Sequence, residues 1–401
     1  MARAILVKKD IMRICTVTTS TPRFEDDNRS PFILDLATAL MNQGNEITII
    51  TMHSPGLPIK DKIKEVPIWR LRYATESKER LDLTRAGIPA AWRSSWTTGF
   101  FLVKLLLAFT SYLIKNGKNY DLLHANWTIA GLAAVLSKPF HRRPVILTLH
   151  GSEVYATQKV WGLRKITRWI LNICDHVICV SNALKDEVVA LGVSETKITV
   201  IPNGVYTLDS LPQNQAKGQT ILFVGSLTEQ KGVKYLLEAF ADVNRSFKNS
   251  RLRIVGEGPE LKNLRAQVQR LKLQEKVIFE GVLAHSKVAE VMQTSSMFVL
   301  PSVNEGFGVV LLESLANGLP AIAFNSGGVK DILNENSGIL VEPKDVQQLA
   351  TAIKRLIIDK ELYDNLRKQG FKKAKGYSWD IIARKVSEIY ASVLEGNETR
   401  Y

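Results

Sequence analysis

The sequence predicts an α/β fold with two doubly wound parallel sheets, one in each half of the chain. Three observations lead to this prediction. At 401 residues the chain exceeds the size of one ordinary hydrophobic core. Short apolar runs of strand length alternate with helix-like segments in both halves. A polar stretch without periodicity, residues 206–220, separates the two series and reads as an interdomain linker.

In the first half, apolar runs predict six strands, at residues 13–18, 46–51, 122–124, 145–150, 176–180 and 198–201. Residues 32–43 have the apolar spacing of a helix that ends at Gly44, a natural helix cap. Ligands of such sheets bind at the carboxyl ends of the strands. His150 and Ser181 lie at two of these ends.

In the second half, apolar runs predict five strands, at residues 221–225, 252–256, 277–280, 297–301 and 321–324. Charged helical segments at 347–356 and 361–374 follow them, and an amphipathic helix at 378–396 ends the chain. We therefore expect a first domain at residues 1–206 and a second at 207–377.

The composition, 45% hydrophobic and 23% charged, is typical of a soluble globular protein. The net charge of +14 is uneven, because residues 1–206 hold 27 Lys and Arg against 17 Asp and Glu. This basic half favours an anionic partner, whether a membrane surface, a nucleic acid or a phosphorylated substrate, although solubility explains it equally well.

One segment, residues 100–114, is intensely apolar and is flanked by Trp92, Arg93, Trp96, Lys115 and Lys118. We expect either a helix packed on the first sheet or a helix lying on a membrane surface. A membrane span is not expected, because no stretch reaches the roughly 18 apolar residues that a span needs and Lys104 interrupts this segment. The first residues also lack the apolar core of a signal peptide. They predict either an extra strand or a start of translation at Met12 rather than Met1.

Cys15, Cys174 and Cys179 are too few and too irregularly spaced for a disulfide framework or a zinc site. All three stand in apolar contexts, so we expect buried free thiols and a reducing cytoplasm.

The segment with the clearest chemistry runs from Asn304 to Glu313. It follows the apolar run 296–300 and places two carboxylates, Glu305 and Glu313, on either side of a glycine-bearing turn that leads into a helix. A strand, a glycine turn and a helix start together direct free backbone N–H groups at an anion. The plain alternative is a loop that carries two solvated glutamates.

This pattern resembles the E-x7-E signature of the family 4 glycosyltransferases, which are retaining enzymes of the GT-B fold. The resemblance extends along nearly the whole chain. Its other blocks are residues 150–153 (His-Gly-Ser-Glu), 180–182 (Val-Ser-Asn), 201–205 (Ile-Pro-Asn-Gly-Val), 224–227 (Val-Gly-Ser-Leu), 231–232 (Lys-Gly), 256–259 (Gly-Glu-Gly-Pro) and 326–329 (Ser-Gly-Gly-Val).

The resemblance implies transfer of a sugar from a UDP- or GDP-sugar to an acceptor hydroxyl, with retention of configuration and without a cofactor or a bound metal. It implies catalytic roles for His150, Glu305 and Lys231. It further implies that the final helix packs back on the first domain. The implied donor-binding residues are Ser226, Gly256, Gly258, Gly306, Phe307, Gly308 and Glu313.

The sequence departs from the family at two places. Ser226 stands where an arginine usually pairs with the diphosphate, and a serine lacks the bidentate fork of a guanidinium. Residues 18–31 replace a glycine-rich loop, and there Arg23 and Arg29 either meet an acceptor or pair with the neighbouring acids. With Asn126 they are the predicted acceptor-side residues.

Two other classes of function remain open: an epimerase or phosphorylase on the same architecture, and a sugar-nucleotide binder without catalysis. For the transferase we expect a role in envelope glycan, polysaccharide or glycolipid synthesis. The acceptor is a glycan, a lipid-linked compound or a small molecule, and no nucleic acid is expected. The expected location is the cytoplasm, with peripheral contact to the cytoplasmic face of an anionic membrane as a second expectation.

Overall fold

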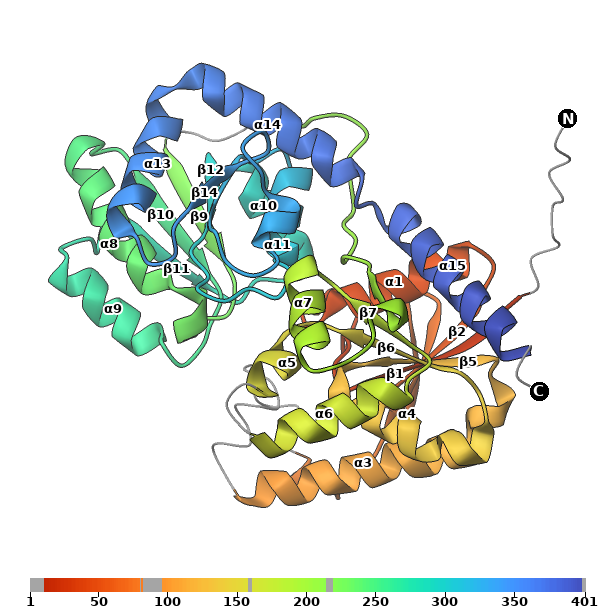
Figure 1. Cartoon of the computed structure of the whole chain (residues 1–401). Helices are drawn as coiled ribbons and strands as arrows, with labels where there is room; N and C mark the ends of the chain where they lie inside the picture. The colour runs from red at the N-terminus through yellow and green to blue at the C-terminus, as the bar shows by residue number, and fades with distance from the viewer. Residues whose placement is uncertain (1–10, 80, 82–95, 158–160, 214–218, 399–401) are drawn as a thin grey trace, which may run out of the picture.

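The computed structural model describes residues 11–79, 81, 96–157, 161–213 and 219–398. These residues form two α/β domains, each with one sheet between layers of helices, and they confirm the predicted fold class (Figure 1). The extra strand considered for the first residues falls on residues 1–10, which lie outside the described part. Met12 is the residue just before β1.

The first sheet has eight strands in the order β3-β4-β2-β1-β5-β6-β7-β8, and all neighbours are parallel except the β3–β4 pair. Its strands are β1 (Arg13–Thr18), β2 (Glu46–Met52), β3 (Lys60–Ile63), β4 (Val66–Leu71), β5 (Leu122–Asn126), β6 (Val145–Leu149), β7 (His176–Cys179) and β8 (Ile198–Val200). Its helices are α1 (Pro31–Asn42), α3 (Trp96–Asn116), α4 (Trp127–His141), α5 (Ser152–Thr157), α6 (Trp161–Ile173) and α7 (Asn182–Ala190).

Alternate side chains of these strands pack on opposite faces, as the two-residue period of a strand requires. Ile14 on β1 joins a cluster with α1, whereas its neighbour Cys15 joins the core under α3 and α4. The three cysteines are buried free thiols, as predicted.

The second sheet has six parallel strands in the order β11-β10-β9-β12-β13-β14. Its strands are β9 (Thr220–Val224), β10 (Arg251–Val255), β11 (Val277–Gly281), β12 (Met297–Leu300), β13 (Ala321–Phe324) and β14 (Ile339–Val341). Its helices are α8 (Val233–Ser246), α9 (Leu261–Arg270), α10 (His285–Gln293), α11 (Val309–Ala316), α12 (Val329–Ile332), α13 (Val346–Ile358) and α14 (Lys360–Lys375).

Three strands, β3, β4 and β14, were not predicted from the sequence. β14 has only three residues, and β4 contains Pro67, which is uncommon inside a strand, and the charged Arg70. β3 reads Lys-Asp-Lys-Ile and lies at the sheet edge, where charged side chains are tolerated.

The apolar segment forms a longer helix than expected. Residues Thr98–Asn119 are long and apolar enough to cross a membrane by length and composition, so the expectation that no stretch has that length is wrong. Lys104 does not break the stretch. The packing shows a helix on the first domain, because Leu105, Phe109 and Leu113 are fully buried against the core and α3 packs on α4. The flanking Trp92 and Arg93 lie outside the described residues.

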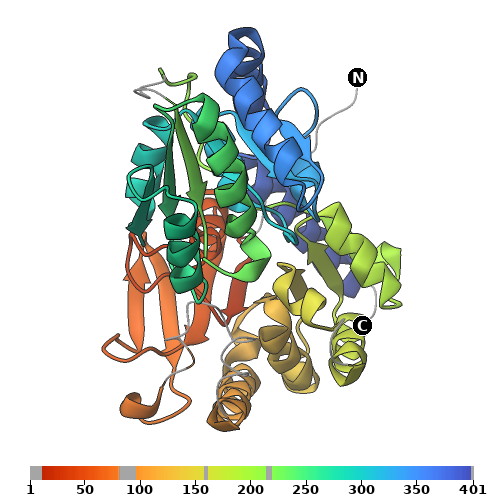
Figure 2. The ribbon, with the colours of Figure 1, turned by 90° about the vertical axis from the view of Figure 1, so that its left-hand side faces the viewer.

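The last helix, α15 (Trp379–Glu398), leaves the second domain and packs on α1 of the first (Figures 1 and 2). Its Tyr390 is fully buried, and the hydroxyl lies 2.6 Å from Nδ1 of His124. The two segments that connect the domains meet each other, since the Val205 N–H donates to the Tyr377 carbonyl over 2.9 Å. The two interdomain connections therefore lie side by side.

Candidate functional site

A cavity of about 680 Å³ lies between the domains, at the carboxyl ends of strands in both sheets. Its wall in the second domain includes Ser226 after β9, Gly256 after β10, and Glu313 on α11. Its wall in the first domain includes Arg23 and Trp127. The cavity is thus placed where open α/β sheets bind ligands.

Two glycines allow the turns of the second domain to pack backbone against backbone. Gly256 has a φ of +134°, and a Cβ there would lie 1.9 Å from the Gly225 carbonyl oxygen. A Cβ on Gly258 would lie 2.3 Å from the Leu227 carbonyl oxygen. Only glycine fits either position, and of the two Gly256 lines the cavity.

Glu313 projects from α11 to the cavity wall. Burial raises the pKa of its carboxyl, while the nearby His285, on the same wall, acts in the opposite direction. A carboxylate in this position can accept hydrogen bonds from the hydroxyl groups of a ligand.

Lys231 and Glu305 form an ion pair, with 2.6 Å between Nζ and Oε2. Glu305 is 8% exposed. The loops that carry the two residues are held together, because the Val303 N–H donates to the Gln230 carbonyl over 2.8 Å. Among the described residues that line the cavity are Glu313, Ser226 and Gly256 but neither Lys231 nor Glu305. His150, Gly258 and residues 306–308 are not among the lining residues either.

The glycine turn before α11 lies against the first domain. A Cβ on Gly306 would lie 2.4 Å from the His150 carbonyl oxygen, and the Gly306 carbonyl accepts a hydrogen bond of 2.7 Å from the Ser181 hydroxyl. Gly308 has a φ of +95° and begins α11, whose first N–H groups have no partner within the helix. The Phe307 side chain is buried, so only its backbone is available at this turn.

His150 stands at the end of β6 between two aromatic rings. Its ring centre lies 4.6 Å from that of Trp127 and 4.9 Å from that of Phe32, and both of these residues line the cavity. Burial, and secondarily His124, lower the pKa of His150 to about 3, so the imidazole is neutral near pH 7. Its Nε2 lies 3.0 Å from Oδ1 of Asn126, and within the described structure its Nδ1 has no hydrogen-bond partner.

Trp127, Phe32 and Ser30 were not identified from the sequence. Trp127 has a φ of +64° and Ser30 a φ of +46°, values that are uncommon for residues other than glycine. Both residues line the cavity, and backbone strain of this kind tends to gather at functional sites. An aromatic residue directly after the strand residue Asn126 was the one sequence signal for Trp127.

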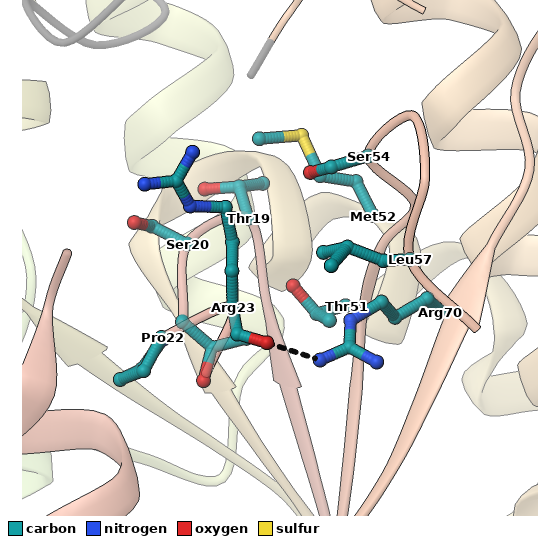
Figure 3. Close-up of a pocket in the computed structure, with 10 residues that line it drawn as sticks. Thr19, Ser20, Pro22, Arg23, Thr51, Met52, Ser54, Leu57 and Arg70 are labelled. Atoms are coloured by element: carbon teal, nitrogen blue, oxygen red, sulfur yellow. Dashed lines mark hydrogen bonds between the residues drawn. The ribbon is translucent and has the colours of Figure 1, made fainter. Parts of the chain in front are cut away.

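The three residues predicted on the acceptor side do not all line the cavity. Arg23 and Arg29 line the cavity, but Arg23 pairs with Asp27 of its own loop over 2.7 Å, as the alternative interpretation allowed. Asn126 contacts His150. The buried Arg70 of β4 supports the loop, since it donates to the Arg23 carbonyl over 3.2 Å (Figure 3). Arg70 also pairs with Asp61 over 2.7 Å.

The same loop reaches across to the second domain. The Asp26 carboxylate accepts hydrogen bonds from the Ser286 N–H over 2.9 Å and from its hydroxyl over 2.8 Å, at the start of α10. Asn28 donates to the Leu283 carbonyl over 3.0 Å. These contacts hold one side of the cavity closed.

Among the described residues, no group of three or more His, Cys, Asp and Glu side chains is arranged to hold a metal ion.

Two family models together match most of the chain. The model described as "Glycosyl transferases group 1" matches residues 210–373, and the model "Glycosyltransferase Family 4" matches residues 31–207. An uncharacterized glycosyltransferase of Methanocaldococcus jannaschii is 31% identical over 291 residues, which cover 70% of this chain and 80% of that one. A glycogen synthase of Mycobacterium tuberculosis is 24% identical, and the match covers 96% of each chain.

Solved structures show the same fold. A sucrose-phosphate synthase from Thermosynechococcus elongatus superimposes with a TM-score of 0.79 at 22% identity, covering 96% of this chain and 100% of that one. The Anabaena protein HepE, solved in complex with UDP-glucose, superimposes with a TM-score of 0.75 at 18% identity, covering 95% and 100%. The similarity thus includes both domains and their arrangement.

Proposed function

The chain belongs to the group 1, family 4 glycosyltransferases, and we propose that it transfers a sugar with retention of configuration from a UDP- or GDP-sugar to an acceptor in envelope glycan, polysaccharide or glycolipid synthesis. One observation carries the proposal. The turn that links Glu305 to the Glu313 helix meets the His150 strand end. The neighbours of this contact line the cavity, namely Glu313 on one side and the Trp127 and Phe32 rings that pack on His150 on the other. A ligand there is held from both sides.

In this proposal the nucleotide lies on the second domain. Glu313 accepts hydrogen bonds from the ribose hydroxyls, and Gly256 lets the main chain approach the nucleotide, with Gly258 allowing the turn behind it to pack closely. UDP-glucose is bound by HepE, which shares the fold and supports a nucleotide sugar as donor. We assign the neutral His150 imidazole to the sugar as a hydrogen-bond acceptor, because its buried Nδ1 has no partner and its ring packs on two residues that line the cavity, Trp127 and Phe32.

The proposed step breaks the bond between the anomeric carbon and the diphosphate oxygen while the acceptor oxygen attacks from the same face. The electron pair of the broken bond stays on the diphosphate, and a diphosphate oxygen takes the proton of the acceptor hydroxyl. The largest contribution expected from the protein is stabilisation of the diphosphate charge. Lys231 and the N–H groups of residues 306–308 at the start of α11 supply it.

The missing arginine at Ser226 leaves room for another cation. Arg23 and Arg29 line the same cavity from the opposite domain, and we propose that one of them reaches the diphosphate when the donor binds. Asp27, which now pairs with Arg23, would then exchange its partner. Lys231, together with these arginines, would make a bound metal unnecessary.

Incubation of the protein with a panel of UDP- and GDP-sugars and a lipid extract, followed by mass spectrometry, tests the proposal. We expect a product heavier than its acceptor by one sugar residue. Nucleotide binding without any product would instead favour a binding protein. A changed donor without a modified acceptor would favour an epimerase or a phosphorylase. Glu313→Ala serves as the donor-site control, since it should abolish or reduce the product.

We also propose peripheral attachment to an anionic membrane surface through α3 and α6. Phe100, Val103 and Leu107 on α3 are 60%, 56% and 59% exposed, which is unusual for three large apolar residues on one helix face. On α6, Ile166 and Trp169 are exposed. Exposed basic residues accompany them, namely Lys104, Arg164, Lys165 and Arg168.

Each basic residue near an anionic bilayer contributes about 1 kcal/mol, so a few of them suffice for reversible attachment. Sedimentation with vesicles at low salt tests this. Phosphatidylglycerol-containing vesicles should pull down more protein than pure phosphatidylcholine vesicles, and salt should weaken the difference by screening. Equal sedimentation with both kinds of vesicle would contradict it.

A further inference from the structure

The cavity between the domains has a set of apolar lining residues that the donor site does not use. They come from five separate parts of the first domain, namely Met52 at the end of β2, Leu81, Leu102 on α3, Ile129 on α4 and Leu163 on α6. Three of them stand in the first two turns of helices that pack in one layer, with α4 against both α3 and α6. The four aliphatic side chains cannot hydrogen-bond to a sugar hydroxyl, and the Met52 sulfur is only a weak acceptor.

A wall of this kind favours hydrocarbon over carbohydrate. Sugars are held by hydrogen-bonding groups, whereas aliphatic side chains gain free energy by removing apolar ligand surface from water. Leu81 is already buried, while Leu102 and Leu163 keep part of their surface accessible at the cavity. The cavity, at about 680 Å³, is also large enough for more than one ligand group.

The apolar wall continues onto the outside of the molecule. On α3, Leu102 is followed by the exposed Val103 at the edge of its face. On α6, Leu163 lies one turn before the exposed Ile166. In Figure 1 the starts of both helices lie below the second domain. Leu102 and Leu163, near these starts, line the cavity. A hydrocarbon chain would therefore pass from the outer face of α3 and α6 to the cavity along apolar side chains.

We propose that the acceptor is a lipid whose hydrocarbon chain lies between the first turns of α3 and α6, against Leu102 and Leu163, while its hydroxyl-bearing head reaches the donor. This inference rests on the proposed glycosyl transfer and adds the acceptor class to it. It distinguishes a lipid-linked acceptor from a free glycan or a small metabolite, because neither of these has an apolar chain to fill this wall.

A photoaffinity experiment tests the proposal without requiring turnover. The probes are alkyl β-D-glucosides with chains of one to ten carbons, each used below its micelle concentration, and a decyl probe that carries a diazirine at its chain end. Each buried methylene should tighten binding by up to about fourfold until the wall is covered. Cross-links of the decyl probe should map to the first turns of α3 and α6. Affinity independent of chain length, or cross-links confined to the outer face of α3, would overturn the proposal.

Matched variants separate this wall from the outer membrane-facing surface. Leu102→Asp and Leu163→Asp should each weaken binding of the decyl probe by tenfold or more and leave the methyl probe unchanged. Leu107→Asp, the same substitution on the exposed face of α3, should leave decyl-probe binding unchanged in the absence of vesicles. Thermal unfolding checks that each variant is folded, and the cross-linking map of the unmodified protein needs no variant.

These binding experiments and the nucleotide-sugar assays can fail separately. If nucleotide-sugar assays yield product but probe binding does not depend on chain length, the proposed sugar transfer is supported and the lipid acceptor is refuted. If chain-length dependence and cross-links appear without transfer from any donor, the lipid site stands and the proposed transfer fails.

Discussion

Single residues carry the chemistry of this site, and the sequence predicts those whose spacing is local. Glu305 precedes a short turn and Glu313 lies on the helix that follows it, so their relative position can be predicted from the sequence. The aromatic rings around His150 could not be predicted, because Phe32, Trp127 and His150 meet only after three strands have paired. The buried brace from Arg70 to the Arg23 carbonyl is hidden for the same reason.

Lys231→Ala and Glu313→Ala should each lose about 1–3 kcal/mol of donor or transition-state binding, as expected for charged hydrogen bonds. Steady-state kinetics with the nucleotide sugar measure this as a fall in kcat/KM of roughly fivefold to 150-fold. Lys234→Ala, which removes a more exposed lysine of the adjoining helix α8, is the matched control. Unchanged donor kinetics in both site variants, with folding intact, would refute their roles.

At the scale of elements, two contacts join parts that are distant in the chain, and neither has a local pattern. The loop after β1 reaches the start of α10, and α15 reaches the first sheet. The sequence predicts that a final amphipathic helix exists, whereas its destination came from the family resemblance. The contacts of the loop after β1 could not be predicted either, because its acidic residues could pair within the loop or with another element. Asp27 pairs within the loop, whereas Asp26 binds Ser286 of α10.

Asp26→Ala should weaken closure of the cavity. Hydrogen bonds from Ser286 lower the pKa of the Asp26 carboxyl, so this contact is made by the ionised form and is present above its ordinary pKa. We expect KM for the donor to rise about threefold to tenfold, which corresponds to a net hydrogen-bond contribution of about 0.5–1.5 kcal/mol. Glu25→Ala, at the exposed neighbouring position, should have no such effect. Equal KM values for the two variants would show that the contact does not close the site.

Tyr390→Phe tests how α15 is attached. The substitution keeps the buried ring but removes the hydroxyl next to Nδ1 of His124, which leaves a buried ring nitrogen without its partner. Stability should fall by about 1–3 kcal/mol, the cost of an unsatisfied buried polar group. Urea unfolding, with the midpoint compared at constant slope, measures this. An unchanged midpoint would mean that the hydroxyl contributes nothing to the docking of α15.

For the whole molecule, buried histidines should make stability depend on pH. Burial lowers the pKa values of His124 and His141 to about 4 and that of His150 to about 3. These groups bind protons in the unfolded chain below about pH 6.5 but stay neutral in the folded one, so their stabilisation is present above that pH and is lost as pH falls. Burial raises the pKa values of Glu153 and Glu313, so these carboxyls bind protons more readily in the folded chain and oppose the loss of stability as pH falls.

The variant His141→Asn isolates one of these contributions away from the site. Between pH 6 and pH 5, the free energy of unfolding of this variant should change less steeply with pH than that of the unmodified protein, by up to about 1.4 kcal/mol per pH unit. Chemical denaturation at pH 7, 6 and 5 gives both curves. Parallel curves for the variant and the unmodified protein would contradict the burial of a neutral His141.

The central claim is retaining transfer from a nucleotide sugar without a bound metal, and the anomeric configuration of the first product formed in the presence of EDTA tests it most directly. Proton NMR of early product, before any equilibration, reads this configuration. We predict the same anomeric configuration as in the donor and an unchanged rate with the chelator. An inverted product, or activity lost with EDTA and restored by a divalent cation, would contradict it.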